Sequence, residues 1–335
     1  MSRRYIPLLV VAAAGLFPTV ANADFSRNET RPSTISSYGS YLAWSSYDAR
    51  RSVYRLYLHD GRRSAPAAGV RPRKAPFDVD LGPDAHGRPV AVYSRCRVEP
   101  YEGEVRSPFL WWYRHGPWDG RGCDVYRYDL GKGRERRARG ASSRGWSEYL
   151  PSIWGTRLVF ARRNRQWVTE LRLRARRTGR SKALPEGQGP DDPGTMALDL
   201  RGRRLVFYRR ALATRRHCGP LDPEEQDEGT RSQLWSVDVV TKRKRLLSSH
   251  CTRGAAGGPH RRQPRLSADA VHVLSSTVDG PVIERLDPES GRVKPGMLPA
   301  HCVHDHAPAA RGSWVMQAEL CDDESESLVL RLLRR

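Results

Sequence analysis

The chain has 335 residues and a formal net charge of +21, with 58 lysine and arginine residues against 37 aspartate and glutamate residues. That length allows two ordinary domains, and the charge favours an anionic partner. Six cysteines are present without a Cys-x-x-Cys pair, which argues against a structural zinc site or a thioredoxin-like redox motif.

The N-terminus has the three parts of a cleavable signal peptide. An arginine pair at 3–4 precedes an apolar stretch over 5–17, and residues 20–23 (VANA) supply a small-x-small cleavage site. The apolar stretch is shorter than the roughly 20 residues that span a bilayer. We expect cleavage after Ala23, a single mature domain over 24–335 with no transmembrane segment, and a secreted or extracytoplasmic location. The general and the twin-arginine export routes are both compatible with this N-terminus.

A short apolar, β-branched or aromatic run recurs six times after this segment. Each copy follows a turn residue and precedes a loop and a second alternating run, which is the pattern of antiparallel strands. The first runs are 41–46 (YLAWSS), 89–95 (PVAVYSR), 157–163 (RLVFARR), 204–210 (RLVFYRR), 270–276 (AVHVLSS) and 313–319 (SWVMQAE). The second runs are 53–60, 125–130, 168–175, 234–239, 282–288 and 328–333.

Several second runs close on a polar turn that leads into a fourth strand. A period in the mid-forties with four strands per unit is typical of a β-propeller. The unit over 148–179 resembles the TolB-type, WD-like propeller repeat, with an acid, a proline, a turn, an apolar strand and a later strand. The units from 192 and from 263 resemble it again, and the likeness covers 35–335. It implies an architecture and leaves the function open.

The predicted fold is therefore all-β, a six-bladed β-propeller of four-stranded antiparallel blades. The chain ends on the third strand of the sixth unit, which leaves that sheet one strand short. A propeller needs closure because open sheet edges invite aggregation. We expect the N-terminal stretch over 24–33 to supply the missing strand and to close the ring.

The six cysteines are even in number in a chain predicted to be exported, so three disulfides are expected. In a four-stranded blade, the loop between the second and third strands emerges on the same face as the connection to the next blade. All six cysteines fall in these two classes of loop. Their placement favours the pairs Cys96–Cys123, Cys218–Cys251 and Cys302–Cys321, although counting cysteines leaves the pairing open.

The segment between Cys96 and Cys123 is the predicted partner site. Aromatic and arginine side chains are enriched at binding hot spots, and a disulfide would lower the cost of ordering the loop. The predicted contact residues are Tyr101, Arg106, Phe109, Trp111, Trp112, Tyr113, Arg114 and Trp118. The alternative is that Trp111, Trp112 and Trp118 form a small core that pins the loop to the propeller.

No common catalytic, phosphate-binding or dinucleotide-binding motif is present in the sequence. We expect no catalytic residue, no metal and no cofactor. His301, His304 and His306 carry donor atoms that suit a transition ion, but closeness in a loop is not coordination. The acidic runs 222–228 and 322–326 lack the pattern of a dedicated calcium loop, so solvated loops are the favoured interpretation.

These features favour a non-catalytic binding or scaffold protein, which we expect to be a monomer. Its arginines are scattered through nearly every segment, which favours an evenly basic surface. An exported basic chain meets envelope or extracellular proteins, acidic glycans and wall polymers before it meets nucleic acid. The alternative is a propeller hydrolase or lyase that acts on an anionic polysaccharide, and a purely structural envelope protein is a third possibility.

Overall fold

The computed structural model describes residues 26–30, 33–98, 120–165, 168–175, 179–184, 194–212, 218, 230–251, 260–277, 280–299, 303–309, 312–318 and 327–333. The predicted signal peptide, residues 1–23, lies outside the described residues. Within them, no helix has the length and hydropathy needed to cross a membrane.

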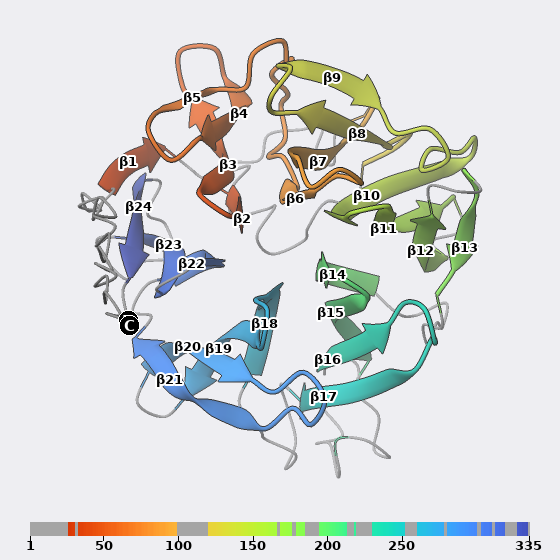
Figure 1. Ribbon diagram of the computed structural model, residues 1–335, viewed down its shortest axis with the longest axis vertical. Helices are drawn as coiled ribbons and strands as arrows, with labels where there is room; N and C mark the ends of the chain where they lie inside the picture. Colours follow the sequence, from red (N-terminus) through yellow and green to blue (C-terminus); the bar gives the residue numbers. More distant parts are fainter. Residues whose placement is uncertain are drawn as a thin grey trace, which may run out of the picture.

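The described strands form six four-stranded antiparallel sheets placed around a central axis (Figure 1). Blade 1 consists of β2 (Ser33–Tyr38), β3 (Tyr41–Asp48), β4 (Val53–His59) and β5 (Ser64–Pro66). Blade 2 consists of β6 (Asp80–Pro83), β7 (Pro89–Arg95), β8 (Asp124–Asp129) and β9 (Arg134–Arg137). Blade 3 consists of β10 (Trp146–Trp154), β11 (Arg157–Asn164), β12 (Thr169–Ala175) and β13 (Ser181–Ala183).

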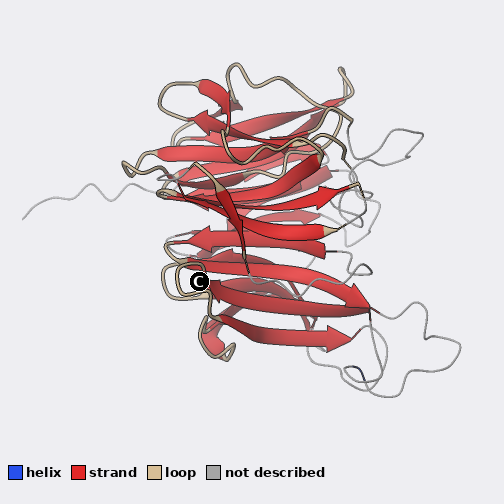
Figure 2. Ribbon diagram, turned by 90° about the vertical axis from the view of Figure 1, so that its right-hand side faces the viewer, coloured by secondary structure: helices blue, strands red, loops and turns tan. Residues whose placement is uncertain are grey.

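The second half of the chain repeats this order, and the strands run through the thickness of the disc (Figure 2). Blade 4 consists of β14 (Gly194–Arg201), β15 (Arg204–Leu212), β16 (Thr230–Asp238) and β17 (Lys244–Cys251). Blade 5 consists of β18 (His260–Leu266), β19 (Val271–Thr277), β20 (Gly280–Leu286) and β21 (Val293–Pro299). Blade 6 consists of β22 (Val303–Ala309), β23 (Gly312–Ala318), β24 (Ser327–Leu333) and β1 (Ser26–Thr30).

The predicted all-β propeller of four-stranded antiparallel blades is confirmed. Each predicted first run lies in the second strand of a blade, and each second run lies in the third strand. β1 pairs antiparallel with β24, with Ser26 opposite Arg331 and Thr30 opposite Ser327. The fourth strand of blade 6 thus comes from the N-terminal stretch, while its other three strands come from the C-terminal end of the chain.

The hydrophobic core lies between the faces of neighbouring blades. Along β7, Val90 and Val92 pack in a cluster with Ile153 and Leu158 of blade 3, whereas Tyr93 packs toward blade 1. Alternate side chains of a strand point to opposite faces of its sheet, so a continuous apolar run serves two neighbours at once. This explains why the predicted first runs contain consecutive apolar residues, such as Val90, Ala91 and Val92, where a strand with one buried face would alternate apolar and polar residues.

A ring of hydrogen bonds, here called the inner ring, joins the innermost strands of the six blades. In five of its links, a side-chain oxygen on one strand accepts a hydrogen bond from a backbone N–H of the next. The acceptor and donor pairs are Ser36 Oγ with Leu81 N (2.9 Å), Asp80 Oδ2 with Ile153 N (3.1 Å), Ser152 Oγ with Leu200 N (2.9 Å), Asp199 Oδ2 with Leu266 N (2.5 Å) and Asp305 Oδ2 with Ile35 N (2.8 Å).

Arginine supplies the remaining link, from β18 to β22. Arg265 donates to Asp305 Oδ2 at 3.2 Å and to the backbone oxygen of His306 at 3.3 Å. Two serines reinforce the ring, because Ser36 Oγ and Ser152 Oγ each donate to a carboxylate oxygen of Asp80 at 2.8 Å. The inner strands pair with only one neighbour inside their own blade, and the inner ring satisfies backbone groups that would otherwise lack partners.

We predict that Ser152→Ala destabilises the protein by about 1–3 kcal/mol, because it leaves the buried Leu200 N–H without its acceptor and removes one of the three donors to Asp80. Denaturant unfolding would measure the change. Ser40→Ala, at an exposed turn position, is the matched control and should change stability by less than about 0.5 kcal/mol. Equal effects of the two substitutions would contradict a stabilising role for the inner ring.

Candidate functional site

Two of the three predicted disulfides are present, Cys96–Cys123 and Cys218–Cys251. Cys302 and Cys321 lie outside the described residues. Cys96 follows the last residue of β7 and Cys123 precedes the first residue of β8, so this disulfide lies at the loop edge of blade 2. Cys251 is the last residue of β17, which corrects its predicted place in the connection that leaves blade 4.

The neck of the loop between Cys96 and Cys123 is tightly fixed. Val98 and Arg121 form an antiparallel bridge, and the N–H of Gly122 donates to Ser147 Oγ at 3.0 Å. A Cβ on Gly120 would lie 2.6 and 2.7 Å from the two sulfur atoms, so only glycine fits there. The eight predicted contact residues, from Tyr101 to Trp118, lie outside the described residues, and their role stays a prediction.

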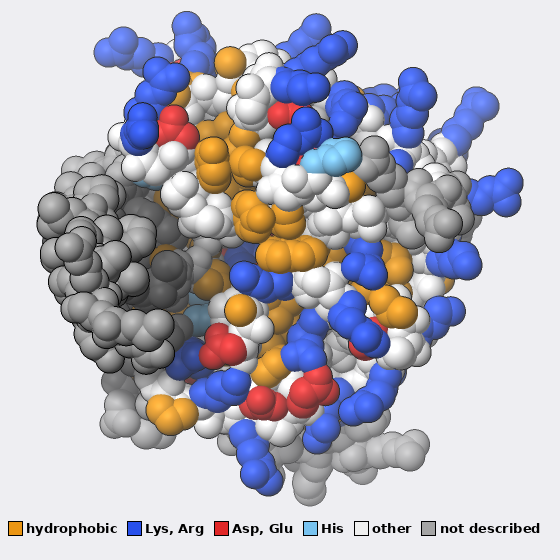
Figure 3. Space-filling model, in the orientation of Figure 1, with side chains coloured by type: hydrophobic (Ala, Val, Ile, Leu, Met, Phe, Trp, Pro, Cys, Tyr) orange, Lys and Arg blue, Asp and Glu red, His pale blue; other side chains and the backbone are white. Residues whose placement is uncertain are grey.

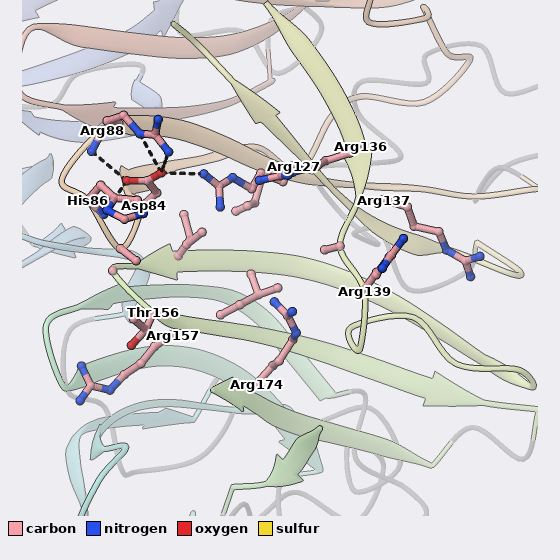
Figure 4. A pocket seen from close by; sticks show the side chains of 16 residues that line it. Asp84, His86, Arg88, Arg127, Arg136, Arg137, Arg139, Thr156, Arg157 and Arg174 are labelled. Atoms are coloured by element: carbon pink, nitrogen blue, oxygen red, sulfur yellow. Dashed lines mark hydrogen bonds and ion pairs between the residues drawn. The ribbon is translucent and has the colours of Figure 1, made fainter. Parts of the chain in front are cut away.

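A cleft with a volume of about 880 Å³, here called the arginine cleft, opens between blades 2 and 3 (Figure 4). Blade 2 contributes the turn between β6 and β7, strands β8 and β9, and the residues just after β9. Blade 3 contributes residues of β10 and β11, the turn between them and one residue of β12. Seven arginines line the cleft, namely Arg88, Arg127, Arg136, Arg137, Arg139, Arg157 and Arg174.

Asp84 is the one carboxylate that lines this cleft, and it organises the turn from which it projects. It accepts hydrogen bonds from the N–H groups of His86 at 2.8 Å and Arg88 at 3.0 Å. Its Oδ2 also receives the Arg88 and Arg127 guanidinium groups, each at 2.9 Å. Burial alone would raise the pKa of Asp84, but these hydrogen bonds outweigh burial and hold the pKa well below its usual range.

The other arginines of the cleft are less completely neutralised. Arg137 forms an ion pair with Asp124 at 2.5 Å, and Arg157 donates to the backbone oxygen of Gly202 at 3.3 Å. Arg136 and Arg139 are exposed and form no ion pair within the described part of the chain. Seven arginines against one aspartate give the lining an excess of six positive charges. A lining with this charge attracts anionic groups.

A second concavity of about 520 Å³, the channel pocket, lies on the central axis and is lined by residues from all six blades. Asp80, Asp199 and Arg265 bring charges of the inner ring to its wall. Burial and, to a lesser extent, the nearby Asp80 carboxylate raise the pKa of Asp199 to about 7 against the opposing effect of Arg265. Trp154 also lines the pocket and packs under the Arg201 guanidinium, 4.8 Å from the ring centre.

The histidines singled out in the sequence do not come together as a loop site in the described structure. His304 and His306 belong to β22, and His306 is fully buried beside Arg265. His301 and both acidic runs lie outside the described residues. Within the described part of the chain, no group of three histidine, cysteine, aspartate or glutamate side chains is placed to hold a metal ion.

No pattern in the sequence predicted the arginine cleft. Basic side chains are spread over much of the face in Figure 3, as the scattered arginines predicted. The arginines of the cleft come from five separate segments between positions 88 and 174, and only the packing of blade 3 against blade 2 brings them together. The one local signal is the run Arg134–Arg139, in which arginine occupies four of six positions.

The structure is similar to known propellers at a level that shows the fold alone. No family model matches the sequence. No curated protein matches it either. TolB from Acinetobacter baumannii matches with a TM-score of 0.50 and 12% identity, over 88% of this chain and 64% of that chain. An oligogalacturonate lyase in complex with manganese matches with a TM-score of 0.51 and 16% identity, over 91% of this chain and 75% of that chain.

The raised pKa of Asp199 predicts a pH-dependent stability. Its ordinary pKa is 3.8 and its folded value is about 7, so the folded state binds the extra proton and loses stability as the pH rises between these values. Asp199→Asn keeps an oxygen for the Leu266 N–H and removes the charge. We expect the variant to gain on the order of 2–4 kcal/mol over the wild type between about pH 4 and pH 8. Urea unfolding at pH 4 and pH 8 measures the free energy of unfolding of both proteins. If the difference between variant and wild type is the same at the two pH values, the raised pKa of Asp199 is contradicted.

Proposed function

We propose that this chain is an exported, non-catalytic six-bladed propeller, closed by its N-terminal strand, that binds an acidic partner of the cell envelope in the arginine cleft. The observation that carries the proposal is the excess of six positive charges in one cleft. Hydrogen bonds to charged groups contribute about 1.5–3 kcal/mol each. A few of them, made together, are sufficient for specific binding.

The disulfides support the export part of the proposal. Two disulfides are expected in an oxidising, extracytoplasmic compartment and are rare in the cytosol. This location agrees with a signal peptide over residues 1–23 that is cleaved after Ala23. The partners within reach of an exported protein are envelope proteins, acidic glycans and wall polymers.

We propose the loop between Cys96 and Cys123 as a second contact surface. The cleft turn over 84–88 and Cys96 lie at opposite ends of β7, and a strand of seven residues spans about 20 Å. The outer arginines of the cleft lie nearer the loop, because Arg137 pairs with Asp124, the residue that follows Cys123. The two contributions are therefore measured with separate variants of the cleft and of the loop.

A hydrolase or lyase that acts on an anionic polysaccharide is the second candidate function. The oligogalacturonate lyase has a similar fold. In the channel pocket, Asp199 has a pKa near 7, where a carboxyl group can serve as a general acid or base near neutral pH. The two candidates differ in one observable, because only the enzyme shortens its ligand.

We predict that the purified mature protein co-sediments with insoluble envelope fragments. The double variant Arg136→Gln/Arg139→Gln should bind them at least about tenfold more weakly, because it removes two charges of the cleft that have no ion-pair partner among the described residues. Arg50→Gln/Arg62→Gln is the matched control, since it removes two exposed charges from turns of blade 1. Equal losses in both variants would show that only net charge matters and would contradict a site in the cleft.

The same assay examines the loop through Trp112→Ala/Arg114→Ala. We expect weaker binding with an unchanged melting temperature if the loop contacts the partner. A lower melting temperature with unchanged binding would make the loop a structural cap and would remove it from the proposed contact surface.

We predict that the intact mass of the exported protein lacks residues 1–23 and six thiol hydrogens, one pair for each disulfide. The physical basis is signal-peptide cleavage followed by oxidation in the extracytoplasmic compartment. Mass spectrometry before and after reduction measures both features. A mass that retains residues 1–23 would contradict the cleavage site, and free thiols at Cys96 or Cys218 would contradict the compartment.

A further inference from the structure

We infer that the ligand of the arginine cleft is a linear acidic polysaccharide, with at least two of its charged groups bound at the same time. This inference rests on the proposed function and specifies the chemical class of the partner. Three observations support it. The arginines extend over a long stretch of the cleft, only some of them are neutralised by acidic residues, and the apolar residues of the cleft floor are buried.

The arginines are spread over a greater length than one anionic group can occupy. Arg88 precedes β7, whereas Arg136 lies on β9, two strands farther out in the same sheet. By the strand register, Arg136 lies level with Val92, which is four residues along the chain from Arg88. With about 4.8 Å between neighbouring strands and about 3.3 Å per residue along a strand, the two backbone positions are separated by roughly 16 Å. Arg157 and Arg174 come from the opposite wall, in blade 3 (Figure 4). Only a ligand with repeated charges reaches both regions of the cleft.

The protein neutralises one end of this set and leaves the other end open. At the inner end, Asp84 holds Arg88 and Arg127 in fixed positions with hydrogen bonds of 2.9 Å. Farther out, Arg136 and Arg139 are exposed and have no ion-pair partner among the described residues. The guanidinium groups of Arg88 and Arg127 are held in place before a carboxylate of the ligand arrives, which lowers the entropy cost of binding. Arg136 and Arg139 supply positive charges that no described acidic residue neutralises.

The apolar floor of the cleft is closed to a ligand. Val92, Ile153 and Leu158 line the cleft, but they are only 1%, 6% and 3% exposed because they belong to the core between blades 2 and 3. A protein partner usually inserts an aromatic or aliphatic anchor into a pocket, and a lipid needs an apolar chamber for its chains. Neither feature is present in this lining, so recognition depends on charge and hydrogen bonding.

The lining also differs from a surface for single-stranded nucleic acid. Such surfaces combine basic groups with aromatic side chains on which bases stack. Among the described residues, the lining of the cleft includes no phenylalanine, tyrosine or tryptophan. A polymer that carries carboxylates and hydroxyl groups, without bases or large apolar groups, fits the observed surface best.

Titration calorimetry with oligogalacturonates tests the inference, because these carry one carboxylate on each sugar. At about 0.15 M salt, where charges farther apart than about 8 Å are screened, we expect the tetramer to bind at least about tenfold more tightly than the monomer. Methyl esterification of the tetramer should abolish binding. Arg136→Gln/Arg139→Gln should weaken tetramer binding at least about tenfold, and Arg50→Gln/Arg62→Gln should leave it unchanged.

Three outcomes would overturn the inference. A tetramer that binds no more tightly than the monomer would exclude a linear site with repeated charges. A tetraglutamate peptide that binds as tightly as the sugar tetramer, and with the same sensitivity to Arg136 and Arg139, would exclude the polysaccharide while the proposed function stands. If no acidic probe binds but envelope binding still depends on Arg136 and Arg139, the polysaccharide inference is wrong and the proposed function stands. If envelope binding is also independent of these arginines, both the inference and the proposed function are wrong.

Discussion

The inner ring of hydrogen bonds is the constraint on which the rest of this structure depends. Each inner strand offers a side chain that holds the backbone of the next, from Ser36 of blade 1 around to Asp305 of blade 6, which returns to Ile35. The blades are otherwise held by apolar contacts, which are not directional. Directional hydrogen bonds between buried groups fix the angle at which each blade meets its neighbour.

The arginine cleft depends on that fixed angle. At the junction of blades 2 and 3, the Gly155 N–H donates to the Pro83 oxygen at 2.9 Å, and a Cβ on Gly82 would lie 2.0 Å from the Ile153 oxygen. Only glycine allows this approach of two inner strands. The junction is therefore closed at its inner edge, and the cleft lies between blades whose relative position is set by backbone contacts. A site assembled from two blades keeps its geometry only because the blades cannot slide.

Charge is divided between the centre and the surface of the molecule. The inner ring places three aspartates, Asp80, Asp199 and Asp305, around a single arginine, Arg265, and burial raises the pKa of each aspartate. The surface and the arginine cleft carry the positive excess. Buried carboxylates stabilise the propeller through hydrogen bonds that they accept, whereas exposed arginines contribute little to stability and are available for binding.

The sequence by itself determined the strands, their grouping into units and the two observed disulfides. These features depend on neighbours in the chain: the run from Pro89 to Arg95 forms β7 with the bounds that its apolar pattern predicts, and Cys96 and Cys123 flank one loop. Only the tertiary structure decided which distant residues meet. Asp80 and Ser152 join two blades across 72 positions of sequence, and Arg136 and Arg157 line one cleft because blade 3 packs on blade 2. The periodicity of a strand shows which of its faces is buried. It does not show which residues of another blade pack against that face, so such contacts cannot be predicted from it.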